Sequence, residues 1–397
     1  MSRLAKRLLP FFTLVVVILF ASIPARASDN GLAKTPPMGW NSWNKFHCHV
    51  SDEMIRGMAD AMVSSGMKEA GYEYVVIDDC WQVGRDTAGN IVPDPQGFPN
   101  GIKALADYVH SKGLKFGIYS DAGTQTCAGR PGSAGHEFQD AIRYAAWGVD
   151  YLKYDWCHTG KDSGKANAEW SYATMRDALK ASGRPILFSI CEWGSNKPWL
   201  WAADIGNMWR TTGDISDCWD CEKHGLSFVT IVDAENGLET YGGPGHWNDP
   251  DMLEVGNGKM TTTEYRAHFS LWCLLAAPLI AGNDLRDMSA DTKEILTNKE
   301  VIAIDQDPLG KQGHRVKADA DCEVWSKQLK DGSRAVVLFN RRATDTMISF
   351  TWEDIGYPAR IYATVRDLWA HKDVGKFDGK WVASVPSHGV VMIKVTP

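Results

Sequence analysis

The sequence lacks several features that mark common classes of protein. Its 397 residues contain no long run of Lys or Arg, and 49 acidic residues outnumber 42 basic ones, which gives a net charge of −7. Because binding to a phosphate backbone depends on clustered positive charge, a nucleic-acid partner is excluded. Low-complexity linkers and Asn-X-Ser/Thr acceptors for N-glycosylation are also absent. With 44% hydrophobic and 23% charged residues, the chain has the composition of a folded protein with one large domain and one smaller domain.

A long hydrophobic run occurs at the N-terminus and has no counterpart later in the chain. Arg3, Lys6 and Arg7 precede the apolar residues 11–20, and Ala25-Arg-Ala27 supplies small residues for cleavage. This pattern predicts a signal peptide over 1–27 and a secreted or periplasmic protein without a membrane partner. A membrane anchor is the alternative, but a span needs about 20 apolar residues. Removing the four basic residues of this segment, which has no acidic ones, changes the net charge from −7 to −11.

The nine cysteines do not form a metal-binding pattern. Cys218 and Cys221 are separated by two residues, and Cys48 lies between two histidines, but neither group has the second Cys or His pair of a zinc site. No metal or cofactor is therefore expected. In an exported protein disulfides are allowed, and an odd number of cysteines leaves at least one thiol free.

Alternation of helical patterns with strand patterns predicts an α/β fold. Glycines such as Gly71, Gly113 and Gly148 close helical segments directly before apolar, β-type runs. Eight such runs over some 270 residues predict a (β/α)8 TIM barrel over 28–308; they cover residues 37–40, 72–77, 114–119, 149–154, 185–190, 207–212, 247–253 and 278–282. Short alternating strands separated by Asp-Gly turns then predict a C-terminal antiparallel β-sandwich domain over 309–397.

Carboxylates and tryptophans are concentrated where the predicted strands end. Because a TIM barrel carries its site at the carboxyl ends of its strands, acidic residues from at least six strands are expected at one mouth; they are Asp78, Asp79, Asp121, Asp155, Glu192, Asp214, Asp249, Asp251 and Asp284. The same strand ends hold Trp40, Trp43, Trp81, Trp156, Trp193, Trp209 and Trp219. Indole rings pack on sugar C–H faces and carboxylates accept sugar hydroxyls, so the combination predicts a sugar site. The alternative is that the tryptophans only pack the barrel rim.

Two of these carboxylates fit the chemistry of glycoside cleavage. That reaction needs a carboxylate nucleophile and a carboxylic acid on opposite sides of the anomeric carbon. Asp155 ends a central strand, and Lys153 points to the same face, where its ammonium can keep Asp155 ionised. Asp214 follows the sixth strand and is the candidate acid/base. From spacing alone, Lys153 and Asp155 forming a structural ion pair remains an equal alternative.

Six motifs extend this interpretation to a known family. In order they are Pro37-Met-Gly-Trp-Asn-Ser-Trp43, Gly71-Tyr-Glu-Tyr-Val-Val-Ile-Asp-Asp-Cys-Trp81, Tyr151-Leu-Lys-Tyr-Asp155, Cys191-Glu-Trp193, Trp209-Arg-Thr-Thr-Gly-Asp214 and Trp247-Asn-Asp-Pro-Asp-Met252. With this order and spacing the chain resembles glycoside hydrolase family 27, which contains α-galactosidases and α-N-acetylgalactosaminidases. The resemblance spans about residues 34–305, and a C-terminal β domain is also a family feature.

The resemblance implies a role for each matching residue. Asp155 would be the nucleophile and Asp214 the acid/base of a retaining double displacement, with Asp214 kept partly protonated. Asp78 and Asp79 would bind the C4 and C6 hydroxyls, Lys153 the C3–C4 side, Arg210 with Asp251 the C2 side, and Trp43 and Tyr119 would shape the pocket. Family disulfides carry over as Cys48–Cys80 and Cys127–Cys157, and Cys127 itself is expected at the substrate site.

Within the family, Glu192 favours an α-galactosidase. The resemblance implies that Glu192 bonds a free 2-hydroxyl, whereas the N-acetyl enzymes carry a smaller residue to admit the acetamide. The expected substrate is an oligosaccharide or polysaccharide with terminal α-galactose. A β-L-arabinopyranosidase is a competing family activity, and a catalytically silent sugar-binding barrel is the alternative from another class.

The sequence departs from the family pattern at two places. The usual disulfide partner of Cys191 is missing, so Cys191 is expected to be free, and Cys218–Cys221 is a candidate local bridge. Trp156 stands where the better-known eukaryotic members have Asn or Gly, which changes the expected leaving-group side of the pocket.

Overall fold

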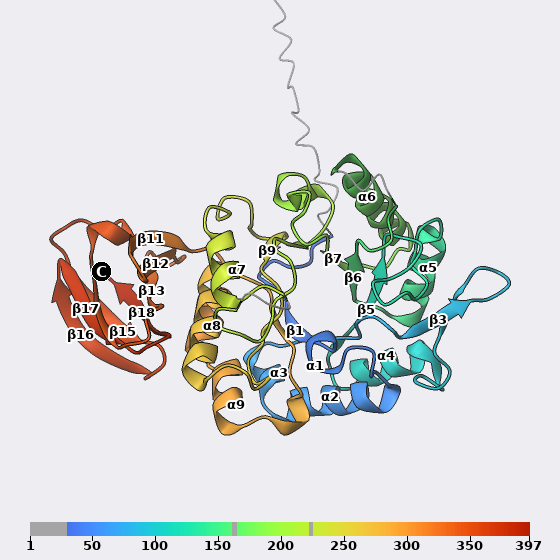
Figure 1. Cartoon of the computed structure of the whole chain (residues 1–397), viewed down its shortest axis with the longest axis horizontal. Helices are drawn as coiled ribbons and strands as arrows, with labels where there is room; N and C mark the ends of the chain where they lie inside the picture. Colours follow the sequence, from blue (N-terminus) through green and yellow to red (C-terminus); the bar gives the residue numbers. More distant parts are fainter. Residues whose placement is uncertain (1–29, 161–164, 222–224) are drawn as a thin grey trace, which may run out of the picture.

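The barrel predicted from the strand periodicity is present. The computed structural model describes residues 30–160, 165–221 and 225–397, so the predicted signal peptide lies outside the described residues. Its central sheet contains eight parallel strands in the order β10-β1-β2-β5-β6-β7-β8-β9 (Figure 1). They are β1 (Met38–Asn41), β2 (Tyr74–Val76), β5 (Lys115–Asp121), β6 (Tyr151–Asp155), β7 (Leu187–Ile190), β8 (Met208–Arg210), β9 (Trp247–Asp249) and β10 (Leu279–Ala281). The circle is completed just after β9, where the Leu253 N–H donates to the Ile280 carbonyl over 2.8 Å.

Helices alternate with these strands and surround them. The longer ones are α2 (Asp52–Ser64), α4 (Gly101–Ser111), α5 (Glu137–Trp147), α6 (Lys165–Ala181), α7 (Phe228–Glu235) and α8 (Thr262–Leu275), and short helices α1 (Trp43–Phe46), α3 (Met67–Ala70), α9 (Ala290–Leu296) and α10 (Lys299–Asp305) complete the set. Gly71 and Gly148 end α3 and α5 with φ of 112° and 83°. A side chain at either position would be strained, which explains why glycine closes these helices.

The C-terminal domain is a β-sandwich, as predicted. Its larger sheet has the order β11-β12-β13-β18-β15-β16 and is antiparallel throughout. A second sheet pairs β14 (Thr346–Thr351) with β17 (Lys380–Val385), and Phe350 and Trp381 pack in the shared core with Val336 and Leu338. The larger sheet consists of β11 (His314–Asp319), β12 (Cys322–Gln328), β13 (Arg334–Asn340), β15 (Tyr362–Asp367), β16 (Lys372–Asp378) and β18 (Gly389–Thr396).

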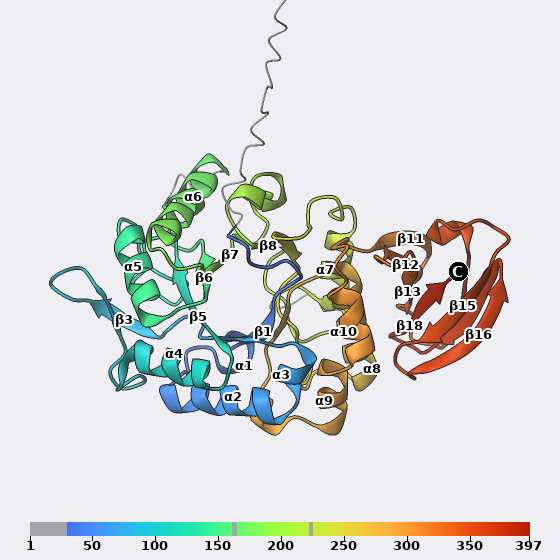
Figure 2. The same cartoon turned by 180° about the vertical axis from the view of Figure 1, so that it is seen from behind.

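Helix α8 joins the two domains. It lies between the barrel and the β domain in both views (Figures 1 and 2) and packs against β12, β13 and β18. The Trp369 indole donates to Ser270 of α8 over 2.9 Å, and His388 pairs with Glu264 over 2.9 Å. The predicted domain boundary at 308/309 falls between the end of α10 and the start of β11.

Two smaller features complete the description. A hairpin of β3 (Gln82–Arg85) and β4 (Ile91–Pro93) projects from the barrel on the side away from the β domain (Figures 1 and 2). Among the described residues, none of the helices has the length and hydrophobicity required to cross a bilayer.

Candidate active site

A cavity of about 240 Å³ opens at the carboxyl ends of the barrel strands. Every predicted catalytic and substrate-binding residue except Glu192 lines it, although these residues lie up to 208 positions apart in the sequence, between Trp43 and Asp251. The wall consists of Trp43, Asn44, Asp78, Asp79, Tyr119, Cys127, Lys153, Asp155, Cys157, Trp193, Arg210, Asp214, Asp251 and Met252. We refer to this space as the sugar cavity.

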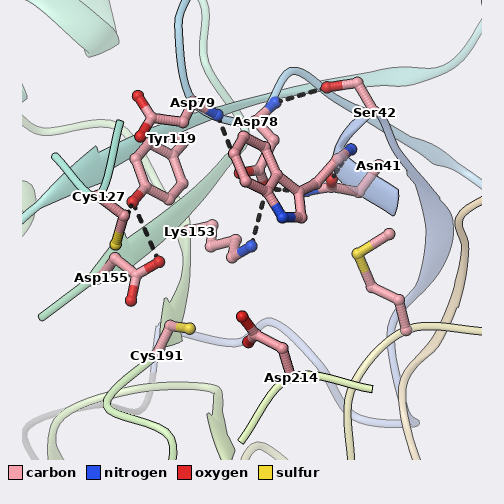
Figure 3. A network of polar contacts seen from close by, with 12 residues as sticks. Asn41, Ser42, Asp78, Asp79, Tyr119, Cys127, Lys153, Asp155, Cys191 and Asp214 are labelled. Atoms are coloured by element: carbon pink, nitrogen blue, oxygen red, sulfur yellow. Dashed lines mark hydrogen bonds and ion pairs between the residues drawn. The ribbon is translucent and has the colours of Figure 1, made fainter. Parts of the chain in front are cut away.

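Asp78 and Asp79 are rigid hydrogen-bond acceptors at one end of the sugar cavity. Both are almost fully buried. The Asp78 carboxylate accepts from Lys153 Nζ at 2.8 Å and from the Asn41 amide at 2.7 Å (Figure 3). Asp79 accepts from the backbone N–H of Ala128 at 2.9 Å. Because each oxygen is oriented by a donor, the pair can bind neighbouring hydroxyls with little reorganisation.

Lys153 forms its ion pair with Asp78 rather than with Asp155. The alternative that Lys153 and Asp155 form a structural ion pair with each other is therefore wrong. The Lys153 charge nevertheless lowers the pKa of Asp155 across the cavity. Asp155 itself accepts a hydrogen bond from the Tyr119 hydroxyl at 3.0 Å and one from the Trp156 N–H at 3.0 Å. Burial outweighs the Lys153 charge and, together with the Asp214 charge, raises the pKa of Asp155 to about 6.

Asp214 has a different environment from Asp155. The Asp214 side chain is 64% exposed, whereas Asp155 is buried. Arg210 donates to Asp214 at 3.1 Å and to Asp251 at 2.8 Å. Partial burial of Asp214 favours its neutral form, but the charges of Arg210 and Lys153 outweigh it and lower the pKa of Asp214 from its ordinary value. The partial protonation expected of Asp214 stays a prediction.

Glu192 is not part of the wall of the sugar cavity, and its predicted contact with a 2-hydroxyl stays a prediction. Its side chain is fully buried, and one carboxylate oxygen accepts from the backbone and side-chain nitrogens of Asn196 at 2.6 and 2.9 Å. Trp193 lines the cavity instead, and Figure 3 shows the Cys191 thiol beside the space between Asp155 and Asp214.

Most of the predicted tryptophan platforms support the strand ends instead of forming the cavity wall. Of the seven, only Trp43 and Trp193 line the sugar cavity. Trp40 and Trp81 are fully buried and donate their indole N–H to backbone carbonyls of neighbouring strand ends, at 2.7 and 2.8 Å. Trp156 stacks on Tyr172 with ring centroids 5.5 Å apart, so its departure from the family pattern does not alter the cavity wall.

The ring of carboxylates is also smaller than predicted. Those in the sugar cavity come from the ends of four strands, β2, β6, β8 and β9, rather than from at least six. Asp121 accepts backbone N–H bonds from Gly123 and Cys157 at 2.6 and 2.9 Å, and Asp284 pairs with Arg286 at 2.8 Å. These carboxylates stabilise turns, because a short acidic side chain after a strand readily bonds nearby backbone nitrogen.

The backbone is strained at three strand ends around the site. Cys80, Trp193 and Asp251 have φ of 79°, 56° and 91°, a region that side-chain-bearing residues rarely adopt. Each lies two to four residues after a barrel strand. Such strain is retained where the surrounding structure needs a particular side-chain direction, and here it surrounds the sugar cavity.

Three disulfides stabilise this side of the barrel. The expected pairs Cys48–Cys80 and Cys127–Cys157 are present, Cys218 is bonded to Cys221, and Cys191 is free and buried. Within the described residues, Cys127 and Cys157 also belong to a group with Asp121 and Asp155 whose ligand atoms lie within 4.8 Å of one another. A cysteine binds a metal ion as its thiolate, and the sulfurs of a disulfide do not form thiolates. Only the two carboxylates of this group are therefore available as metal ligands.

Two wall residues were not singled out from the sequence. Asn44 directly follows the motif that ends at Trp43, and Met252 is the last residue of the motif that contains Asp251. Asn44 donates to the buried Glu254 carboxylate at 2.6 Å. The sequence gives little indication that an uncharged side chain next to a recognised motif belongs to a site. Only the position of that side chain in the tertiary structure shows that it lines the cavity.

Comparison with known proteins agrees with this geometry. Residues 35–307 match the family described as Alpha galactosidase A, and residues 319–395 match the Alpha galactosidase C-terminal beta sandwich domain. Alpha-galactosidase A of Cellvibrio japonicus is 54% identical over 96% of this chain and 97% of its own length. The solved α-galactosidase I of Mortierella vinacea is 41% identical with a TM-score of 0.90, covering 92% of this chain and 98% of that one.

A Saccharomyces cerevisiae α-galactosidase solved with raffinose is 31% identical with a TM-score of 0.89, and the match covers 94% of this chain and all of the yeast one. The full-length relationships, the two matched domains and the arrangement of the sugar cavity lead to one conclusion: the chain belongs to the α-galactosidases of glycoside hydrolase family 27.

Proposed function

We propose that the enzyme hydrolyses terminal α-D-galactosyl residues by a retaining double displacement, with Asp155 as nucleophile and Asp214 as acid/base. The observation that carries this assignment is that these two carboxylates line the same sugar cavity, beside hydrogen-bonding groups already oriented by their neighbours. The same arrangement does not fit a silent sugar-binding barrel, which would need the acceptors but not a second, exposed carboxylate next to the nucleophile.

In the first step, an Asp155 oxygen attacks the anomeric carbon and the bond to the leaving oxygen breaks. Asp214 gives its proton to that oxygen, so the aglycone departs as a neutral alcohol. In the second step, Asp214 takes a proton from water, whose oxygen attacks the anomeric carbon and releases Asp155. Two inversions give a galactose with the α configuration of the substrate.

Other wall residues orient the sugar. Asp78 and Asp79 would accept hydroxyl hydrogens at C4 and C6, Lys153 would donate on the C3–C4 side, and Tyr119 holds Asp155 in place through its 3.0 Å hydrogen bond. Arg210 and Asp251 form an ion pair at 2.8 Å on the proposed C2 side. Relatives at up to 54% identity that are α-galactosidases favour this activity over the alternatives.

We also propose export through the predicted signal peptide over 1–27. Three disulfides among the described residues fit an oxidising compartment, where such bonds persist. Expression of the full chain and N-terminal sequencing of the exported product would test this proposal, with Ser28 expected as the first residue.

A substrate panel with a nucleophile variant tests the activity. The purified protein is assayed on aryl α-D-galactoside, β-L-arabinopyranoside and α-N-acetylgalactosaminide, next to Asp155→Asn and to the surface control Asp107→Asn. We expect α-galactoside turnover to dominate, and Asp155→Asn to lower kcat/KM by about a thousandfold or more while the control keeps it. Preference for the arabinoside, or full activity in Asp155→Asn, would contradict the assignment.

Azide distinguishes the roles of the two aspartates. In Asp155→Ala, azide can attack from the side of the missing carboxylate, so the product should be β-galactosyl azide. In Asp214→Ala, Asp155 still forms the intermediate and azide replaces water, so the product should be α-galactosyl azide. NMR of the anomeric proton identifies each product, and the reverse pattern would exchange the two roles.

A further inference from the structure

Glu235, the last residue of α7, is a buried carboxyl group that the proposed reaction does not use. It is 1% exposed, although a glutamate is rarely buried so completely without a partner of opposite charge. Its side chain contacts two neutral groups instead. They are the hydroxyl of Thr211, which directly follows β8, and the amide of Gln312, which lies between α10 and β11.

The contacts of the Thr211 hydroxyl need one more hydrogen than a threonine has. Its Oγ1 contacts a carboxyl oxygen of Glu235 and also lies 3.1 Å from the carbonyl oxygen of Asp249. A hydroxyl donates one hydrogen, and a carbonyl or an ionised carboxylate can only accept. Both contacts are satisfied when a protonated Glu235 donates to Oγ1 and the hydroxyl donates its own hydrogen to the Asp249 carbonyl. The other Glu235 oxygen then accepts from Gln312, at 3.4 Å.

We propose that Glu235 is a protonated positioning residue, a neutral carboxylic acid that fixes Thr211 and, through the main chain, Arg210 at the sugar cavity. The proposal deepens the function proposed above and rests on it for the role of Arg210. Glu235 itself is not part of the cavity wall, so it acts on the site only through its neighbours.

Thr211 anchors the main chain beside Arg210. Its N–H donates to the Asp249 carbonyl over 2.9 Å, so both the main chain and the side chain of Thr211 are held to the end of β9. The carbonyl of the next residue, Thr212, accepts from the Arg210 guanidinium at 3.1 Å. The same guanidinium nitrogen bonds Asp214, the proposed acid/base, also over 3.1 Å. A shift of this main chain would therefore displace the group that orients Asp214.

The surroundings of Glu235 favour its neutral form. Burial, together with the charge of Asp249, raises the pKa of Glu235 to about 7, because the hydrogen bonds with Thr211 and Gln312 compensate only in part. The other ionic groups near this end of α7 pair with one another; they are Asp233, Arg315, Glu323 and Arg341. Glu235 therefore keeps its proton over the pH range in which the catalytic pair is singly protonated.

Thermal stability as a function of pH tests the protonation. The folded protein binds the Glu235 proton more tightly than the unfolded chain, so this contribution to stability is complete below the ordinary pKa of 4.5 and is lost as pH rises through about 7. An amide stays neutral and is spared that loss. The Tm of Glu235→Gln minus that of the wild type should therefore increase by several degrees between pH 4.5 and pH 8. The same difference for Glu169→Gln, at an exposed position of α6, should stay constant. A constant difference in both variants would overturn the proposal.

Steady-state kinetics on an aryl α-galactoside tests the positioning role. Glu235→Gln can still donate to Thr211 and accept from Gln312, so kcat/KM should stay within about twofold of the wild type. Thr211→Val loses the hydroxyl and should lower kcat/KM about tenfold, mainly through kcat, whereas Thr211→Ser should restore it. Full activity in Thr211→Val, or an equal loss in Thr211→Ser, would contradict the role. Absence of turnover by the wild type would instead refute the proposed α-galactosidase activity, and the Tm comparison needs no substrate.

Discussion

Asp155 and Asp214 show how two identical side chains acquire different acid strengths in one cavity. Asp155 is buried, and its ordered partners do not fully compensate for the loss of water, so its pKa rises to about 6. Asp214 is exposed and bonded to Arg210, whose charge lowers the pKa of Asp214 from its ordinary value. The two carboxylates interact, so their pKa values describe the pair rather than either residue alone. The pair loses its last proton near pH 6.

The pH dependence of kcat/KM follows from these pKa values. The first step needs one ionised carboxylate and one proton on the pair, and the burial of Asp155 lets the pair keep that proton up to about pH 6. As pH rises through about 6 the proton is lost, so kcat/KM on an aryl α-galactoside should fall, approaching tenfold per pH unit. Initial rates at low substrate between pH 3 and 9 check this, and a profile still rising above pH 7 would contradict it.

Asp214→Asn with α-D-galactosyl fluoride isolates the nucleophile. Fluoride leaves without a proton from Asp214, so the fall of kcat/KM at high pH should disappear. Activity should then rise with Asp155 ionisation and level off. The midpoint should lie below 6, because the Asp214 charge is one of the causes that raise the pKa of Asp155.

At the scale of elements, the Cys127–Cys157 disulfide connects the loop after β5 to the end of β6. It joins segments 30 residues apart, and both cysteines line the sugar cavity next to Tyr119 and Asp155. Cys218–Cys221 closes a separation of only 3 residues and lies outside the sugar cavity. Because a longer loop loses more chain entropy when it is closed, the first bond should stabilise the fold more.

Replacing both members of each pair by serine compares the two bonds. Cys127→Ser with Cys157→Ser should lower the free energy of unfolding by about 2–4 kcal/mol and kcat/KM by about tenfold, because the strand ends that hold Tyr119 and Asp155 are no longer joined. The Cys218–Cys221 double variant should change both quantities less. Thermal unfolding and steady-state kinetics measure the two effects. Equal losses of stability and of kcat/KM in the two double variants would contradict the prediction, because neither the length of the closed loop nor the distance of the disulfide from the site would then matter.

At the scale of the whole molecule, the β domain covers α8, a barrel helix that is buried along most of its length. Trp369 contributes an indole contact to this interface: it donates to Ser270 and packs against Phe269 with ring centroids 6.4 Å apart. Trp369 does not line the sugar cavity at the barrel mouth. The interface should therefore contribute to stability without taking part in substrate binding.

Trp369→Ala should separate these contributions. Loss of the partly buried indole should cost about 2 kcal/mol and lower Tm by a few degrees, while kcat/KM stays within about twofold. Tyr362→Ala, at a 63% exposed position of β15, is the matched control and should leave Tm nearly unchanged. Calorimetry together with the α-galactoside assay tests the prediction. A large loss of activity without loss of stability would mean that the β domain influences the site.

Much of this architecture was predictable because local patterns report local physics. Gly71 and Gly148 marked helix ends, eight apolar runs marked strands, and a barrel places their carboxyl ends on one face. Asp155 and Asp214 could be selected because catalytic carboxylates follow strands and because their motifs match a known family. The tryptophans were harder to interpret, since a residue that binds sugar and one that supports a strand end have the same periodicity.

By itself the sequence determined the barrel, the β-sandwich and the family, because chain-local periodicity and motif spacing are enough for these. Only the tertiary structure decided which side chains reach the sugar cavity and how they are charged. It turned Glu192 toward Asn196, paired Lys153 with Asp78 and connected Arg210 to Asp214. Hydrogen-bond partners and burial depend on residues far away in the chain, so pKa values and side-chain directions arise only when those residues have been brought together.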